Sequence, residues 1–110
     1  MNEERIEKSK LTVAAADHIS PEKKAELLEA LSKIKPAIAE ASQVHSDHAQ
    51  NIAKLVEASA HTAARKEERP EHLKKLLQEL KQSAQNFEAS HPHLVAAVNE
   101  YSTVLSALGI

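Results

Sequence analysis

Glycine occurs only once in this chain of 110 residues, as Gly109, next to the last position. Gly-rich phosphate loops, dinucleotide-binding fingerprints and tight hairpin turns need glycine, so the sequence excludes most nucleotide-binding enzymes. Helices do not need it. No segment alternates apolar and polar residues over a useful length, and we therefore predict an all-α fold that forms a single helical domain over residues 1–110.

Proline, at Pro21, Pro36, Pro70 and Pro92, gives the signals for helix starts and kinks instead. Ser20 before Pro21 predicts a helix start, because serine caps helices and the first helical position tolerates proline. An apolar stripe runs without interruption through Pro36, which predicts a kink there and one long bent helix over residues 21–66. The expected architecture is an elongated antiparallel helical bundle or hairpin around this long Pro-kinked central helix.

The remaining helices are predicted from apolar residues at three- and four-residue spacing. A weak first helix covers roughly residues 2–17, a further helix starts at Pro70, and the last helix follows Pro92. Their stripes are Ile6, Val13 and Ala16; then Leu73, Leu76, Leu77, Leu80, Ala84 and Phe87; then Leu94, Val98, Tyr101, Leu105 and Leu108. The only tyrosine, Tyr101, is therefore expected in the core.

Charge is unevenly distributed along the chain. Residues 65–81 contain ten charged side chains in 17 positions, whereas residues 36–64 contain four in 29. Two apolar stripes lie side by side on this charge-poor segment and cover an arc too wide for one partner helix. The second stripe consists of Ala49, Ala53, Val56, Ala60 and Ala63. A helix with such an arc lies either centrally in the fold or at a subunit interface. We expect this stripe to form the subunit interface of a homodimer, with a helix of another protein as a further possible partner.

Histidines in the same segment are the clearest candidates for a functional site. His45 and His48 are three residues apart and so share a helix face, with Asp47 beside them, and His61 follows further along. Imidazole and carboxylate groups bind zinc, so a metal site at His45, His48 and His61 is one reading. The chain has no H-E-x-x-H or Cys/His pattern. We interpret His45 and His48 as polar residues within a helical seam and keep the metal site as the alternative.

A second group of candidate residues precedes the last helix. His91 and His93 flank Pro92 at the predicted helix start, where the helix dipole disfavours a protonated imidazole. We interpret Phe87, His91 and Pro92 as a structural cap and turn, and Gly109 as the residue that ends the last helix.

These C-terminal residues resemble a known family. The order Phe87, Glu88, His91, Pro92 and Leu94 matches the pattern F-E-x-x-H-P-x-L, and Leu105, Ser106, Gly109 and Ile110 match L-S-x-x-G-I. Both patterns are similar to those of the bacterial domain-of-unknown-function family 4404, and the similarity covers the last third of the chain well. Residues 20–35 match only as an amphipathic helix. The resemblance implies a small, soluble bacterial protein and no catalytic activity.

Composition narrows the classes of partner. Fourteen basic and 16 acidic side chains give a net charge of −2, and the basic cluster around Lys74 and Lys75 is interleaved with acidic residues, so we expect no nucleic-acid partner. The charged N-terminal residues and the longest apolar run, Leu94–Val98, predict no signal peptide, no membrane partner and a cytoplasmic location.

No nucleophile is spaced with a base, and no carboxylates are paired for acid and base catalysis, so we expect no catalytic residue, no cofactor and no enzyme. The sequence predicts a non-enzymatic helical interaction or oligomerisation protein. The alternative is a His-based metal-binding or pH-responsive protein, since protonating all seven histidines moves the charge from −2 to +5. Stability or assembly should then weaken toward about pH 5.

Overall fold

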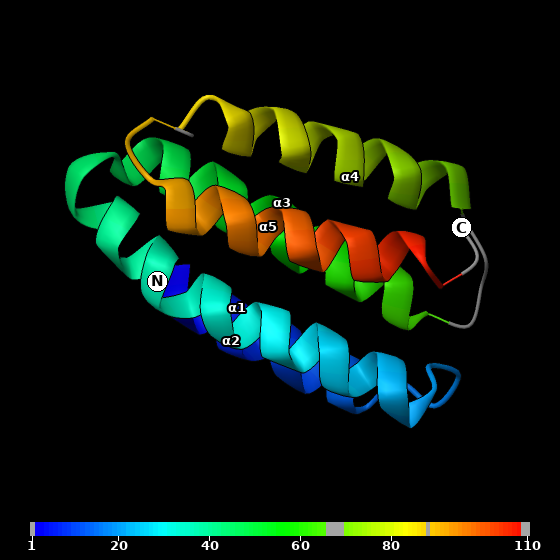
Figure 1. Cartoon of the computed structure of the whole chain (residues 1–110). Helices are drawn as coiled ribbons and strands as arrows, with labels where there is room; N and C mark the ends of the chain where they lie inside the picture. Colours follow the sequence, from blue (N-terminus) through cyan, green and yellow to red (C-terminus); the bar gives the residue numbers. More distant parts are fainter. Residues whose placement is uncertain (1, 66–69, 88, 109–110) are drawn as a thin grey trace.

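The computed structural model describes residues 2–65, 70–87 and 89–108. Within these ranges the regular structure is entirely helical, and the predicted all-α class is confirmed (Figure 1). The helices are α1 (Asn2–Ala14), α2 (Pro21–Val44), α3 (Ser46–Ala64), α4 (Pro70–Gln85) and α5 (Pro92–Ser106).

Proline sets three of the helix starts, as the sequence predicts. Pro21, Pro70 and Pro92 are the first residues of α2, α4 and α5. The Ser20 side chain accepts a hydrogen bond from the Lys23 backbone N–H at 3.3 Å, which satisfies one of the free donors of the first turn.

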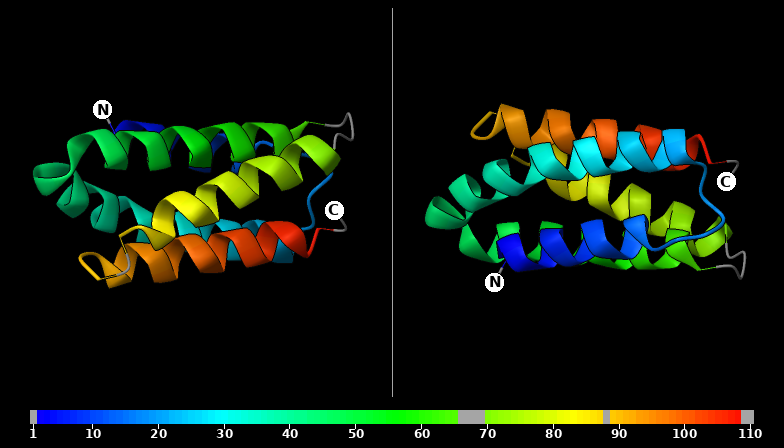
Figure 2. Two further views of the ribbon diagram at one scale, coloured as in Figure 1. Left: turned by 90° about the horizontal axis from the view of Figure 1, so that it is seen from above. Right: turned by 90° about the horizontal axis from the view of Figure 1, so that it is seen from below.

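The prediction of one long helix over residues 21–66 is wrong. Helix α2 continues through Pro36 but ends at Val44, and the chain turns back at His45, whose φ and ψ are −130° and 63° (Figure 2). The His45 N–H still donates to the Ala41 carbonyl at 2.8 Å, and its carbonyl accepts from the Ala49 N–H at 2.9 Å. Both backbone groups of His45 therefore stay hydrogen-bonded in the turn. The chain reverses here without a glycine or a proline.

The helices form a closed ring around one core. Helix α1 packs against α2 and α3, α5 packs against α2 and α4, and α4 completes the ring against α3. Consecutive helices run in opposite directions (Figures 1 and 2). The radius of gyration is 12.7 Å and the extents are 37 × 23 × 20 Å, close to the roughly 13 Å of a compact 100-residue domain. The bundle is thus shorter and more compact than the elongated form predicted, because the long segment folds back at His45.

The predicted interface stripe lies inside this core. Ala53, Val56 and Ala60 have no exposed surface, and Ala49 and Ala63 are 1% and 8% exposed. The wide apolar arc of α3 is real, but α1, α2 and α4 of the same chain cover it. A subunit interface at these residues is therefore wrong, because their burial is already complete within one chain.

One hydrogen-bonded network crosses the core between α3 and α5. The Tyr101 hydroxyl, fully buried as predicted, lies 2.8 Å from the Ser59 hydroxyl and donates to the Val56 carbonyl at 3.2 Å. Ser59 donates to the same carbonyl at 2.9 Å. Burial raises the pKa of the Tyr101 phenol, because the charged form would lose its hydration.

Ion pairs on the surface connect helices that are neighbours in the ring. Arg5 of α1 pairs with Glu57 of α3 at 3.1 Å, Lys35 of α2 with Glu7 of α1 at 2.7 Å, and Lys33 of α2 with Glu100 of α5 at 3.1 Å. The bonded Lys35 ammonium lowers the pKa of the Glu7 carboxyl, and Glu100 raises the pKa of Lys33. Such exposed pairs contribute little to stability, because water and salt screen them, but they favour the correct neighbours.

Candidate functional site

The α2–α3 and α4–α5 connections meet at the same end of the bundle, on the left of Figure 1. We call this region the turn end and define it as the described residues of 41–48 and 86–93. It joins the two sequence features that were candidates separately, the His45 and His48 pair and the Phe87 to Pro92 motif. The sequence gives no sign of this meeting, because His45 and His91, which are in contact, are 46 positions apart.

Two histidines face each other across the turn end. Nδ1 of His45 lies 3.2 Å from Nε2 of His91, a hydrogen-bonding distance, and both rings are partly buried. His45 precedes α3 and His91 precedes α5 as the N-cap residue, with nearly equal φ and ψ of −130° and 63° against −136° and 65°. The two helix starts thus have the same local geometry and are connected through their rings.

Phe87 lies at the centre of the contacts. Its ring centroid is 4.6 Å from that of His48, 5.5 Å from that of His45 and 6.2 Å from that of His91, and the phenylalanine is only 6% exposed. The His48 ring meets it edge to face at 71°, a favourable geometry worth about 1 kcal/mol. We call His45, His48, Phe87 and His91 the ring cluster.

The alternative metal site does not assemble as the sequence suggested. His61 lies on the last turns of α3, where its Nε2 accepts a hydrogen bond from the Arg65 guanidinium at 3.1 Å. Thirteen residues of helix separate it from His48, about 20 Å along the axis. The structure brings His45 and His48 to Phe87 and leaves His61 away from them, so the three-histidine ligand set is wrong. In the described part of the chain, no group of three or more His, Cys, Asp or Glu could hold a metal ion.

His91 and Pro92 lie at the start of α5 as predicted, but the His91 side chain does not cap the helix. His91 occupies the N-cap position and Pro92 the first position of α5, and the His91 N–H donates to the Phe87 carbonyl at 2.7 Å. The His91 side chain makes no capping hydrogen bond, because its ring is directed to His45. Gly109 lies outside the described residues, so its role as helix terminator stays a prediction.

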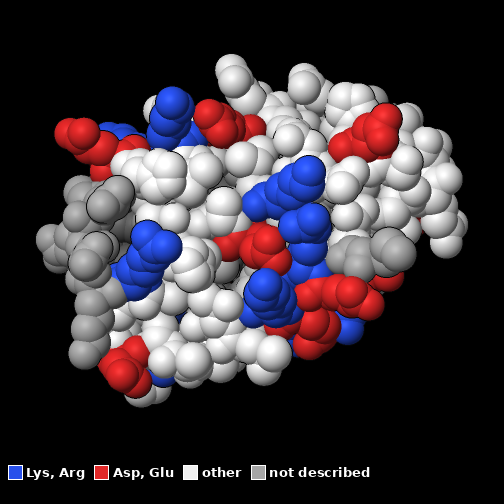
Figure 3. Space-filling model, turned by 180° about the vertical axis from the view of Figure 1, so that it is seen from behind, with Lys and Arg blue, Asp and Glu red and all other residues white. Residues whose placement is uncertain are grey.

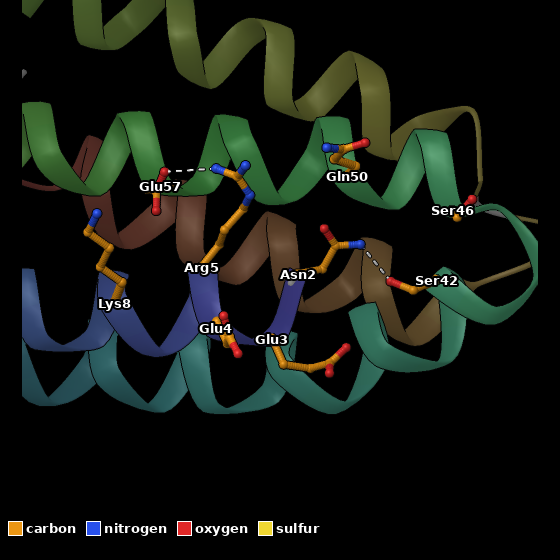
Figure 4. A pocket seen from close by; sticks show the side chains of 9 residues that line it. All are labelled: Asn2, Glu3, Glu4, Arg5, Lys8, Ser42, Ser46, Gln50 and Glu57. Atoms are coloured by element: carbon orange, nitrogen blue, oxygen red, sulfur yellow. Dashed lines mark hydrogen bonds and ion pairs between the residues drawn. The ribbon is translucent and has the colours of Figure 1, made fainter.

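A polar groove of about 630 Å³ opens beside the turn end, between α1, α2 and α3 (Figure 4). Two interactions cross it: Asn2 donates to the Ser42 hydroxyl at 2.7 Å, and Arg5 pairs with Glu57 at 3.1 Å. Its lining consists of Asn2, Glu3, Glu4, Arg5, Lys8, Ser42, Ser46, Gln50 and Glu57. These residues carry both charges, and several already satisfy one another, so the groove is not a strong attractor for an ion of either sign.

The turn end also carries an exposed apolar side chain that sequence reasoning missed. Val44, the last residue of α2, is 68% exposed; in the described residues Leu11 on α1, at 70%, is the other large apolar side chain with this exposure. Val44 is the last residue of α2 and is not among the buried residues of that helix, so the only sequence signal was its place next to His45. Figure 3 shows charges of both signs interspersed on the face seen from behind, whereas the turn end, on the right of that view, is mostly uncharged.

The fold and site together define a five-helix ring with an aromatic and imidazole cluster at one end. Comparison with known protein families finds no match, and no curated protein or solved structure proves similar to the chain. The resemblance to the bacterial family 4404 therefore stays a prediction. Among the described helices, none combines the length and apolar character that crossing a membrane requires.

Proposed function

We propose that this chain is a non-enzymatic helical binding protein that self-associates through its turn end. The observation that carries the proposal is the exposed Val44 beside the ring cluster, on a part of the surface with few charges. The apolar stripe on α3 is buried and offers no contact surface. We therefore place the proposed contact at the end of the bundle and not on the side of α3.

The low charge of the turn end favours it as a contact surface. Residues 41–53 contain one charged side chain, Asp47, and residues 82–99 contain one, Glu88. The centres of protein interfaces are depleted in charged residues and enriched in aromatic ones. In a two-fold contact the same patch meets itself, so a nearly uncharged patch avoids the like-charge repulsion that the other faces would produce.

The size of this end predicts a weak complex. A cross-section of 23 × 20 Å offers about 460 Å² from each partner, or roughly 900 Å² in total, which lies in the range of transient interfaces. We therefore expect dissociation constants in the high micromolar range and a monomer in dilute solution. The monomer is stable alone, because the core is complete within one chain.

The test is sedimentation of the tag-free full chain over a wide concentration range, with two matched variants. Val44→Glu places a carboxylate in the proposed contact, once from each copy, and should abolish self-association. Leu11→Glu changes an equally exposed apolar residue on α1, outside the turn end, and should leave it unchanged. A wild-type chain that stays monomeric up to millimolar concentration, or equal weakening by both variants, would contradict the proposal.

A pH-responsive protein is the second candidate, and the contact between His45 and His91 is the observation that favours it. In that case the acid-induced change would occur in the monomer and would not depend on protein concentration. Circular dichroism and sedimentation at pH 7.5 and pH 5.5, each at two protein concentrations, separate the two functions.

A further inference from the structure

We infer that His45 and His91 form an acid-released latch between the α2–α3 and α4–α5 connections. This inference rests on the geometry of the two rings and does not require the proposed self-association. At 3.2 Å, one ring nitrogen donates a hydrogen bond to the other. A neutral imidazole has one donor and one acceptor nitrogen, whereas a protonated imidazole has two donors. The latch therefore holds while at least one ring is neutral and is lost when both rings carry a proton.

Charge makes the doubly protonated pair unfavourable. His91 is the N-cap residue of α5, so its ring lies at the positive end of that helix dipole, whereas His45 lies between the negative end of α2 and the positive end of α3. Neither side chain makes a capping hydrogen bond that a proton would preserve. Two imidazolium charges in contact would repel each other, and the start of α5 would also repel that of His91, so moving the connections apart relieves these interactions.

In the described part of the chain no carboxylate is buried, so none there supplies a buried counter-charge to the two rings. The titratable side chains nearest in sequence are Glu40 on α2, Asp47 and His48 on α3, and His93 on α5, and all four are exposed. Attraction from exposed carboxylates is screened by water and salt. His48 packs on the same Phe87 ring and adds a third positive charge when it is protonated. Residues 82–87 at the end of α4 carry no charge, and Glu88 lies outside the described residues.

Release of the latch would uncover Phe87. The rings of His45, His48 and His91 all pack around this side chain, which is 6% exposed in the closed form. Because protonation of the two rings drives the opening, the opened form should be present at pH 5.5 and absent at pH 7.5. The acid form thus differs from the neutral form by a separated turn end with an accessible aromatic ring, while the helices at the other end stay packed.

The test is amide hydrogen exchange by NMR on the tag-free full chain at pH 7.5 and pH 5.5, corrected for intrinsic exchange. The reporter amides belong to His45, Ala49, His91 and Val95. They donate to the backbone carbonyls of Ala41, His45, Phe87 and His91, respectively. Their protection should fall at least about fivefold at pH 5.5, the factor that one hydrogen bond between neutral groups contributes. The Lys24 amide, bonded to Ser20 at the start of α2, should change less than twofold.

Two conservative variants separate the latch from general acid destabilisation. The substitutions His45→Asn and His91→Gln place an amide group near each of the two ring nitrogens that are in contact, so that one amide N–H can donate to the oxygen of the other amide, and neither group titrates. The double variant His45→Asn, His91→Gln should keep its protection at pH 5.5 within twofold of that at pH 7.5. His61→Gln, a change at the other end of α3, should respond as the wild type does.

The wild-type chain alone can overturn the inference. If its four reporter amides keep their protection while ring NMR signals show that His45 and His91 become protonated, no latch exists. The inference also fails if the double variant folds and shows the same loss of protection as the wild type.

Discussion

Raising the pH above about 10 should destabilise this fold, and one side chain, Tyr101, should cause a distinct part of that loss. Its phenol is fully buried between α5 and α3, and burial raises the pKa of this group above its usual value of 10.0. In the unfolded chain the phenol loses its proton near pH 10, whereas in the folded chain it stays protonated. Unfolding therefore releases a proton above pH 10, and stability falls as the pH rises.

The size of the effect follows from the proton count. One proton released on unfolding lowers the free energy of unfolding by about 1.4 kcal/mol per pH unit. Between pH 10 and pH 12 the loss approaches roughly 3 kcal/mol, against a total of about 5 to 15 kcal/mol for a domain of this size. Below pH 10 the contribution of the buried phenol is fully present.

The matched control is Tyr101→Phe. At neutral pH the variant should lose about 1 kcal/mol, because Ser59 keeps its own bond to the Val56 carbonyl and no donor is orphaned. At alkaline pH it should lack the slope that Tyr101 causes, while lysine titration affects both proteins alike. Urea denaturation at several pH values from 8 to about 11.5 measures the two slopes.

Because Tyr101 is the only tyrosine and the chain has no tryptophan, tyrosinate absorbance reports this residue alone. The native protein should develop the absorbance only as it unfolds. Absorbance that rises with a midpoint near pH 10 in the folded protein would refute the reasoning, as would equal alkaline slopes for the wild type and Tyr101→Phe.

Three further predictions concern the core, an ion pair and a helix cap. Ala53→Glu should abolish cooperative thermal unfolding, because a fully buried, unpaired carboxylate costs several kcal/mol. The control variant Ala25→Glu, on the exposed face of α2, should unfold as the wild type does. A folded Ala53→Glu monomer would show that this position is not in the core. Lys35 lowers the pKa of Glu7 from its usual 4.5, so the stability from this pair is present above that pH and is lost as the pH falls below it. In Glu7→Gln the melting temperature should therefore fall less steeply at acid pH than in the wild type. Ser20→Ala should lower the free energy of unfolding by about 1 kcal/mol, measured by urea titration, since it removes the side-chain cap of α2; an unchanged midpoint would contradict that cap.

Local chemistry predicted most helix starts and the core-facing stripes. Ser20 and the prolines mark where backbone hydrogen bonding begins, and the apolar spacing of α4 and α5 identifies buried residues such as Leu80 and Tyr101. The break at His45 escaped prediction because no glycine or proline marks it. The available signal was weaker: Ser46 and Asp47 are residues favoured at helix starts, directly after the β-branched Val44.

The candidate site could not be predicted because it depends on that break. Once α2 and α3 form separate helices, α3 packs between α1 and α4, its small residues enter the core, and His45 reaches the α4–α5 connection. With a single long helix, the same wide apolar arc demanded a second subunit. The break between α2 and α3 at His45 thus decides whether the alanines of α3 form an interface or a core. It also decides whether His45 and His91 come into contact.

The most direct test of the central claim is a dilution series of the isotope-labelled chain followed by two-dimensional NMR, from about millimolar to low micromolar concentration, as weak complexes require. Self-association through the turn end predicts concentration-dependent amide shifts confined to the described residues of 41–48 and 86–93. Shifts that map to another face, or spectra that do not change with concentration, would contradict it.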